Sequence, residues 1–366
     1  MAELQTSPNN IPAPQRTFGQ IGILIFTAII IFALAPFTVA SIVGITNSTA
    51  ETREAAAQLL EVSGAAYRTA IEGWLSERQS DLDTISVDPT FVQQVLLIKA
   101  NPQNSLVQAN ILDRFTPFSG TDQPFAEIYL LDEVGNLIFG TQPSNIGTLH
   151  SSRPYHRYGL LGPHITEPIL DLATNEFFIA ISVPVINVNL ETEAVLVGQF
   201  SVEVLIRKIT ISDQAIGEEG EVYLVSPYQR PLSSLRYPFG EDELNSQIIK
   251  MALVSPDLKT ETATYPNYAN MDVIGNYQHI QDTNILLISE IPTSEAYADI
   301  TTQIRFNAFL GIALVILAGF TSSLLYRRIN TPLAKMTQHA QALSNGDWQA
   351  AFTYDRGDEM GTLVAA

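Results

Sequence analysis

Residues Ile21–Gly44 read IGILIFTAIIIFALAPFTVASIVG, twenty-four residues without one ionisable side chain. A second uncharged run, Phe306–Tyr326, has twenty-one residues. A helix needs about 20 apolar residues to cross the hydrocarbon core of a bilayer. Both runs reach that length. The sequence therefore predicts two transmembrane helices, at residues 18–44 and 306–326, on either side of a large central domain.

A cleaved signal peptide is the alternative explanation of the first run. Thr38-Val39-Ala40 is a poor cleavage site, and the segment before the run carries only Arg16 and Glu3 as charged residues. The run is also longer than the roughly 7–15 apolar residues of a signal peptide. We therefore expect an uncleaved membrane anchor, preceded by a polar cytoplasmic tail at residues 1–17.

Basic residues near the ends of the two runs predict the orientation of the chain. Arg327, Arg328 and Lys335 follow the second run, and Arg16 precedes the first, whereas the flanks that face the central domain are poor in Lys and Arg. We therefore expect both termini in the cytoplasm. Residues 45–305 are then extracytoplasmic, outside an inner (plasma) membrane.

The net charge of −19 belongs to the central domain, because the charged residues of 1–20 cancel and so do those of 327–366. A domain this acidic is repelled by nucleic acid and by anionic lipid headgroups. We therefore expect no nucleic-acid partner. The chain has no cysteine, which excludes disulfides, thiolate metal sites and cysteine nucleophiles.

The central domain begins with a helical pattern at about residues 51–86, where apolar residues recur at spacings of three, four and seven. A mixed, helical segment follows at about 88–114. The pattern then becomes that of strands, around a loop rich in Pro, Gly and His at Thr141–Pro168. The expected strands are Phe125–Asp132, Leu137–Gly140, Glu176–Val185 and Glu193–Val204.

A second, similar cycle follows, with an irregular insert and a short helix near residues 241–252. Its expected strands are Gly217–Val225, Met271–Tyr277 and Ile285–Glu290, and a helix from about Ser294 continues into the second apolar run. Helices and antiparallel strands in this order predict an α+β fold. We expect a long stalk helix and two tandem PAS-like antiparallel-sheet modules, a distal one at about 88–208 and a proximal one at about 209–297.

Several stretches of the central domain resemble the double Cache family of bacterial extracytoplasmic sensors. In chain order they are Ser152-Arg-Pro-Tyr155, Ile165-Thr-Glu-Pro168, Asp171, Ile181–Val185, Gly217–Val225, Val273–Tyr277 and Ile288–Pro292. Each stretch is short, but their order and their place between two apolar runs are typical of the family. The resemblance covers residues 45–305 and implies a ligand sensor.

Residues 327–366 resemble a HAMP relay domain, beginning at Pro332-Leu333. Asn345-Gly346-Asp347 is expected to end the first helix, and Asp358-Glu-Met-Gly361 resembles the start of the second, which is incomplete. The apolar residues of the first helix, at coiled-coil spacing, are Leu333, Met336, Ala340 and Leu343. A HAMP relay is a four-helix bundle of two chains, so the resemblance implies a homodimer.

The resemblance also implies a ligand site in the distal module. Family members that sense amino acids carry an Arg followed by aromatic residues, then a Tyr and Asp pair, then a later Asp. A guanidinium grips a carboxylate with two parallel hydrogen bonds, a carboxylate holds an ammonium group, and aromatic rings form the walls. The positions that match this pattern are Arg153, Tyr155, His156 and Asp171, and Tyr129 on the first strand adds a further wall.

The sequence departs from the family pattern at three places. His156 replaces a Tyr, Ile169 stands where the Tyr of the pair is expected, and residues 199–201 lack the later Asp. We therefore expect a small ligand that is an amino acid, an amine or carboxylate-like. Plain structural roles also remain open, since a loop Arg pairs locally, a loop Tyr packs and an Asp caps a turn.

Histidines are the remaining candidates for chemistry. His150, His156 and His164 share one loop, but spacings of six and eight match no compact metal-ligand motif. We expect no metal and no cofactor. His339 lies on the relay helix without an acidic motif beside it, so we interpret it as a surface residue.

These patterns together predict a transmembrane signal-transduction receptor, in which a ligand in the distal module shifts a two-state equilibrium that the second span relays to HAMP. Two alternatives remain. The longer protein could be a histidine kinase, nucleotide cyclase or phosphatase with its output domain beyond Ala366, because residues 1–366 contain no catalytic motif. The chain could also be a structural envelope protein that senses nothing.

Overall fold

The computed structural model describes residues 20–120, 123–172, 175–208, 216–240, 243–254 and 262–346. The chain divides into two units. One comprises Met1–Ala50 with Asp299–Ala366, and the other comprises Glu51–Ala298. The expected cytoplasmic tail and the HAMP stretch Asp358–Gly361 lie outside the described residues.

Within the described part of the chain, two helices are long and apolar enough to cross a membrane. The first is α1 (Gln20–Ser86), in which the apolar run and the stalk pattern form one continuous helix that contains Pro36. The second is α8 (Ala298–Leu325), followed by a π-helical turn, η3 (Tyr326–Asn330). Many of their apolar side chains are exposed, unlike those of a soluble core helix. Examples are Leu24, Ile31, Phe32, Ile312 and Phe320.

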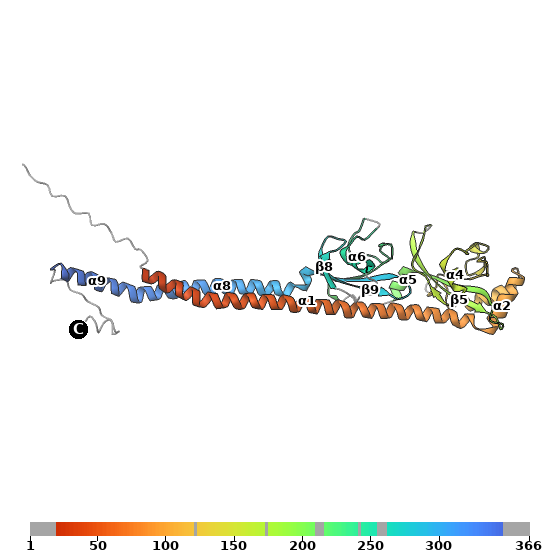
Figure 1. The fold of residues 1–366 in the computed structure, drawn as a ribbon, viewed down its shortest axis with the longest axis horizontal. Helices are drawn as coiled ribbons and strands as arrows, with labels where there is room; N and C mark the ends of the chain where they lie inside the picture. Colours follow the sequence, from red (N-terminus) through yellow and green to blue (C-terminus); the bar gives the residue numbers. More distant parts are fainter. Residues whose placement is uncertain are drawn as a thin grey trace, which may run out of the picture. The chain divides into compact units, whose positions relative to one another are not determined.

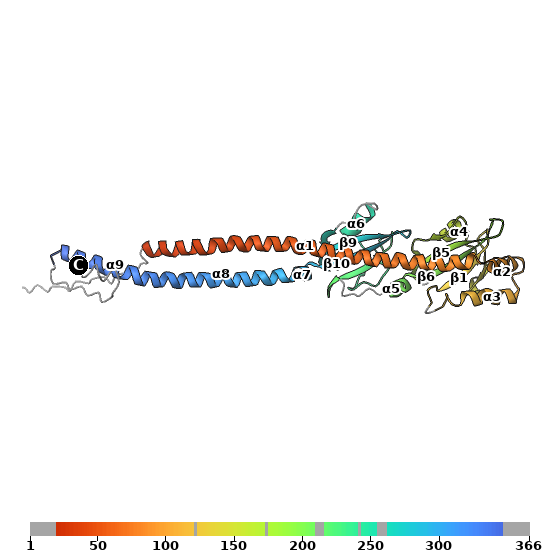
Figure 2. The ribbon, with the colours of Figure 1, turned by 90° about the horizontal axis from the view of Figure 1, so that it is seen from below.

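The first part of α1 lies beside α8 in both views of the ribbon (Figures 1 and 2). The Asn307 side chain donates a hydrogen bond of 3.0 Å to the Ser41 hydroxyl. At Gly311, an added Cβ would lie 3.3 Å from the Phe37 ring. A small residue and a polar pair at the contact are typical of packed membrane helices.

Helix α9 (Thr331–Ser344) carries the four apolar residues of the expected HAMP seam. It ends where the sequence predicted, because Gly346 adopts a φ of +87°, which favours glycine and stops the helix. Leu333, the first seam residue, is 38% exposed.

The distal module is an antiparallel sheet with strand order β2-β1-β6-β5-β3, and β4 also pairs with β5. Its strands are β1 (Glu127–Leu131), β2 (Leu137–Gly140), β3 (His164–Ile165), β4 (Ile169–Asp171), β5 (Glu176–Ile186) and β6 (Thr192–Ser201). Its helices are α2 (Pro89–Ala100), α3 (Ser105–Phe115), the 3-10 turn η1 (Pro143–Asn145), α4 (Pro154–Gly159) and α5 (Val202–Lys208).

The two faces of the distal sheet have different partners because side chains alternate along a strand. Ile128, Leu196 and Phe200 belong to a large core with α1, α2 and α3, where the Trp74 ring meets the Phe200 ring edge-on at 4.8 Å. Tyr129, Val197 and Ala180 face the other way. Helix α4 packs on that second face, against β3, β5 and β6.

The proximal module is a second antiparallel sheet, with strand order β7-β10-β9-β8. Its elements are β7 (Glu221–Val225), α6 (Gln247–Val254), β8 (Thr262–Pro266), β9 (Asp272–Ile280), β10 (Ile285–Pro292) and α7 (Thr293–Ala296). Leu60 of α1 is buried with Ile274 and Ile291 on one face. Four tyrosines belong to the hydrophobic cluster on the opposite face, and Figure 1 shows α6 on the side of the sheet away from α1.

The predicted α+β fold is confirmed, with a long helix and two antiparallel sheets. The strand expected to reach Val204 instead ends at Ser201 and turns into α5, because the Ser201 hydroxyl accepts a hydrogen bond from the Val204 amide and begins the helix. The loop expected at Thr141–Pro168 contains α4, which begins at Pro154. Proline is favoured in a first helical turn.

Candidate functional site

Helix α4 places two of the predicted site residues, Tyr155 and His156, over the distal sheet. Gly159 at its end lies so close to the sheet that an added Cβ would come within 2.7 Å of Val195 and 2.8 Å of the Ser182 hydroxyl. No larger residue fits there without moving the helix. The close approach presses Tyr155 onto the sheet, while Arg153 at the start of the helix is exposed.

Three rings pack together on this face of the sheet. Tyr129 of β1 and Tyr155 of α4 meet edge-on, with centroids 6.2 Å apart. The His150 ring lies 5.7 Å from Tyr129 and 5.9 Å from Tyr155. The two tyrosines are only 1% and 3% exposed. Two of the predicted site residues are therefore brought into one aromatic cluster.

A chain of hydrogen bonds connects Tyr155 to a buried carboxylate. The Tyr155 hydroxyl donates to His150 Nδ1 at 2.7 Å, and His150 Nε2 lies 2.7 Å from the Thr148 hydroxyl. Thr148 donates its own proton to the Asn145 carbonyl at 2.6 Å, so Nε2 carries the histidine proton. Asn145 Nδ2 then donates to both oxygens of Glu127, at 3.1 and 3.2 Å.

Charges of both signs act on the two tyrosine hydroxyls. Burial raises the pKa of Tyr129 far above its usual value; the charge of Glu127 adds to this effect, and Arg153 opposes it. Burial also raises the pKa of Tyr155, again with Arg153 opposing and Glu127 adding. Both hydroxyls therefore stay protonated. The guanidinium and the carboxylate thus affect the pKa of the same pair of tyrosines.

Two further groups of the site have shifted pKa values. Burial raises the pKa of the Glu127 carboxyl, against the opposing hydrogen bond from Asn145. Burial lowers the pKa of His150, and the Arg153 charge lowers it further. His150 is therefore neutral at pH 7, as its hydrogen bond from Tyr155 requires.

His156 points to a different partner. It is buried, and Nε2 donates a hydrogen bond of 3.0 Å to the Asp132 carbonyl. That bond ties α4 to the turn between β1 and β2. Nδ1 of the ring is buried without a hydrogen-bond partner among the described residues. The structure places His156 as a support of α4, beside the aromatic cluster but not within it.

Asp171 is not brought to the cluster. It ends β4 opposite Glu176 at the start of β5. Ala180, which packs in the cluster with Tyr155, lies four residues further along β5. At the usual rise of a strand this is about 13 Å.

Glu127 is the site residue that sequence reasoning missed. It is 7% exposed and pairs across the sheet with Gln199, at the position where an acid was expected on β6. The carboxylate thus stands on the neighbouring strand. The sequence does carry a signal, because Glu127 is two residues before Tyr129 and alternate residues of a strand share a face. His150 and Asn145 lack such a signal, since neither lies in a strand.

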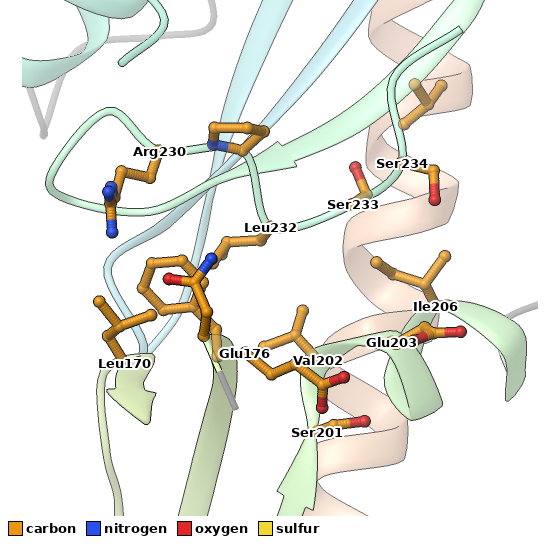
Figure 3. Close-up of a pocket in the computed structure, with 14 residues that line it drawn as sticks. Leu170, Glu176, Ser201, Val202, Glu203, Ile206, Arg230, Leu232, Ser233 and Ser234 are labelled. Atoms are coloured by element: carbon orange, nitrogen blue, oxygen red, sulfur yellow. The ribbon is translucent and has the colours of Figure 1, made fainter. Parts of the chain in front are cut away.

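Four cavities are lined by residues in the described ranges, and none of these four includes Arg153. One of about 590 Å³ lies between the two sheets. Figure 3 shows that Glu176 and Ser201 reach it from the distal module and Arg230 and Leu232 from the proximal module. A second, of about 620 Å³, is lined by the residues that flank Glu221. The aromatic cluster is filled by its own side chains.

Comparison with known families identifies both parts of the chain. Residues 46–300 match the sequence model of the Cache domain, and residues 324–366 match that of the HAMP domain. No curated protein sequence matches the chain. The Cache match covers most of the chain, so it is sufficient to assign the family.

Solved structures with a similar fold are sensor domains. The ligand-binding domain of the Pseudomonas fluorescens chemoreceptor CtaA, in complex with L-isoleucine, is 18% identical, with 69% of this chain and 98% of that chain covered at a TM-score of 0.46. The domain of the Pseudomonas aeruginosa chemoreceptor PctB with L-Gln is 18% identical, at 65% and 92% coverage and a TM-score of 0.45. The sensor domain of the V. cholerae histidine kinase DctB is 15% identical, with 60% of this chain and 98% of that chain covered at a TM-score of 0.42. Similarity this low assigns no ligand.

Proposed function

The chain belongs to the Cache domain family, and on that premise we propose that it binds a small ligand carrying a carboxylate and an amine in its distal module. A Cache sensor domain followed by a HAMP domain makes the chain a signal-transduction receptor. The ligand would lie between Arg153 and Glu127, against Tyr129 and Tyr155. An amino acid has both groups, and a plain amine or carboxylate would use one end of the site.

The observation that carries this proposal is that Tyr155, two residues after Arg153, meets Tyr129, two residues after Glu127, edge-on with ring centroids 6.2 Å apart. The charges of Glu127 and Arg153 both affect the pKa of these two tyrosines. A guanidinium binds a carboxylate through two parallel hydrogen bonds. A buried carboxylate with few donors is a strong acceptor for an ammonium group, and aromatic rings exclude water between the two ends. Opposite charges held apart by rings match a zwitterion better than an ion of one sign.

The buried rings set a condition on binding. Tyr129 and Tyr155 are almost fully covered, so a ligand that contacts them must displace covering side chains. Arg153 is exposed and can meet the ligand first. We propose that His156 positions α4 during this exchange through its bond to Asp132, and that Asp171 lies outside the direct contacts.

We further propose how the signal leaves the sensor. The order of apolar helix, Cache domain, apolar helix and HAMP domain supports a membrane-bound receptor. We propose spans at residues 18–44 and 306–326 in the inner membrane, with 45–305 outside, both termini in the cytoplasm and HAMP at 327–366. The exposed seam on α9 supports a homodimer, since a coiled-coil seam needs a second helix.

A ligand screen tests the proposal. The full chain in lipid nanodiscs would be titrated with amino acids, amines and monocarboxylates, and its melting temperature recorded. Binding stabilises the native state by mass action, so we expect an upward shift with at least one amino acid. If no member of the panel shifts the melting temperature, the proposal is wrong, and the covered rings would favour a chain that senses no small molecule.

A further inference from the structure

The proximal module contains a cavity of about 290 Å³ that no part of the proposed function uses. Phe239 lines it from the segment between β7 and α6, and Ser246 lines it just before α6. Asn267 and Tyr268, from the turn between β8 and β9, complete the wall. The cavity therefore lies where three segments of the proximal module meet.

The Ser246 hydroxyl is a buried polar group that could bond a ligand in this cavity. Ser246 is 5% exposed, and its oxygen is buried without a hydrogen bond among the described residues. Buried hydroxyls are almost always paired, by protein, water or ligand. A polar group of a small molecule in the cavity would supply the partner that the protein does not.

Aromatic rings form a second feature of the cavity. Phe239 and Tyr268 meet edge-on with centroids 5.8 Å apart. Tyr268 also meets Tyr223 edge-on at 5.7 Å, so its ring is held in place. Fixed aromatic rings attract organic cations through their negative faces.

Two carboxylates accept hydrogen bonds from residues that line the cavity. The Tyr268 hydroxyl donates a hydrogen bond of 2.5 Å to Glu221, and the Asn267 side chain donates one of 3.3 Å to Glu290. Glu290 is 2% exposed. Burial and the bond to Glu221 raise the pKa of Tyr268, and the charge of Glu290 acts in the same direction.

None of the described residues that line the cavity is basic. Arg236 lies outside this lining: its backbone N–H donates a hydrogen bond to Glu221, and its guanidinium donates to the carbonyls of Gly220 and Glu218. The wall of the cavity therefore places no positive charge against a bound cation.

We propose that this cavity is a second ligand site, for a small organic ammonium ion. The cationic head lies against Phe239 and Tyr268, whose hydroxyl donates to Glu221, and a polar group of the ligand pairs with the Ser246 hydroxyl. The site belongs to the proximal module, so it works independently of the distal cluster. One receptor then reads two kinds of molecule.

Choline and its uncharged carbon analogue, 3,3-dimethylbutan-1-ol, test the proposal as a matched pair. They share size and hydroxyl and differ in charge. The full chain in nanodiscs would be titrated with each by calorimetry. We expect choline to bind at least about tenfold more tightly than the alcohol, because only the cation gains from the rings and the acids.

Two variants and a control locate the site. Ser246→Ala is expected to weaken choline binding about fivefold, the usual effect of one lost hydrogen bond. Its melting temperature without choline should not fall, because the removed hydroxyl has no hydrogen-bond partner among the described residues. Phe239→Leu keeps an apolar side chain and should weaken binding about tenfold. Arg153→Ala, in the distal module, should leave choline binding unchanged.

Three results would overturn the proposal. One is the absence of choline binding at millimolar concentration. Another is equal binding of choline and the neutral alcohol. The third is choline binding that Arg153→Ala abolishes and Ser246→Ala leaves intact, which would place choline in the distal module. None of these results bears on whether an amino acid binds at the distal cluster, so the two proposals fail separately.

Discussion

The Tyr155 hydroxyl donates a hydrogen bond of 2.7 Å to Nδ1 of His150. This bond joins α4 to the loop before it. His150 also contacts the Thr148 hydroxyl, Thr148 donates a hydrogen bond to the Asn145 carbonyl, and the Asn145 side chain donates to Glu127 on β1. A ring from a helix and an acid from a strand are thereby held in one network. The aromatic wall and the acidic end of the proposed ligand site are therefore connected, and a change at Tyr155 is expected to alter Glu127.

Tyr155→Phe and Tyr129→Phe form a matched pair that tests this network. Each removes one buried hydroxyl, but only that of Tyr155 makes a hydrogen bond of normal geometry. We expect Tyr155→Phe to lower the free energy of unfolding by about 1 kcal/mol, and Tyr129→Phe to leave it unchanged. Urea denaturation followed by Trp74 fluorescence in a Trp348→Phe background measures both. Equal effects of the two changes would argue against the network.

Gly159→Ala tests whether the close packing of α4 on the sheet is needed for ligand binding. The new methyl group would meet Val195 and Ser182 closer than real side chains approach, so α4 must shift. We expect ligand affinity to fall at least about tenfold, because misplaced contact groups lose their geometry, together with a lower melting temperature. Gly162→Ala is the control, since a Cβ there meets nothing within 4 Å. An unchanged affinity in Gly159→Ala would mean that α4 does not carry the site.

Glu290 predicts a pH dependence of stability. Burial raises its pKa from 4.5 to about 7, against the opposing hydrogen bonds from Tyr265, Tyr223 and Asn267. The native state therefore holds a proton that the unfolded chain has lost between these values. The contribution of Glu290 to stability is greatest below pH 4.5 and decreases as the pH rises to about 7, by about 3 kcal/mol in total.

The Glu290→Gln variant isolates this contribution. Its side chain cannot titrate, so the decrease in melting temperature between pH 5 and 7 should become smaller than in the unchanged chain. Thermal denaturation in nanodiscs at each pH measures the difference. Identical pH profiles for the two chains would show that Glu290 ionises normally.

The absence of cysteine makes the membrane orientation easy to test. Tyr228 is 64% exposed in the proximal module, and Asn345 is exposed just after α9. In intact cells a membrane-impermeant maleimide should label Tyr228→Cys, and should label Asn345→Cys only after permeabilisation. The reverse pattern would contradict the proposed topology.

Local patterns predicted most of the fold. Apolar runs of membrane length indicated two membrane-crossing helices, and β2 occupies the predicted residues 137–140. The short elements escaped prediction. Six-residue α4 and the strand β8 are too short to show a period, and α5 depends on one capping bond at Ser201. Such elements form because tertiary contacts hold them, and a single sequence does not display those contacts.

The candidate site was only partly predictable for a similar reason. Arg153, Tyr129 and Tyr155 were singled out from the sequence, and the structure packs the two tyrosines on one face of the distal sheet, with Arg153 exposed at the start of α4. Glu127 depends on strand register, which pairs it with Gln199. A carboxylate on a strand usually indicates a solvated face, and only burial shows that this one does not.

Arg153→Ala, measured against Arg157→Ala, tests the central claim most directly. Both arginines are exposed on the same segment, and only Arg153 acts on the two tyrosines. Calorimetry of the full chain with the amino acid found in the screen should show affinity reduced about 10- to 100-fold by Arg153→Ala, the usual effect of a lost charged hydrogen bond, and unchanged by Arg157→Ala. Equal affinity in both variants would contradict a ligand held by Arg153 in the distal module.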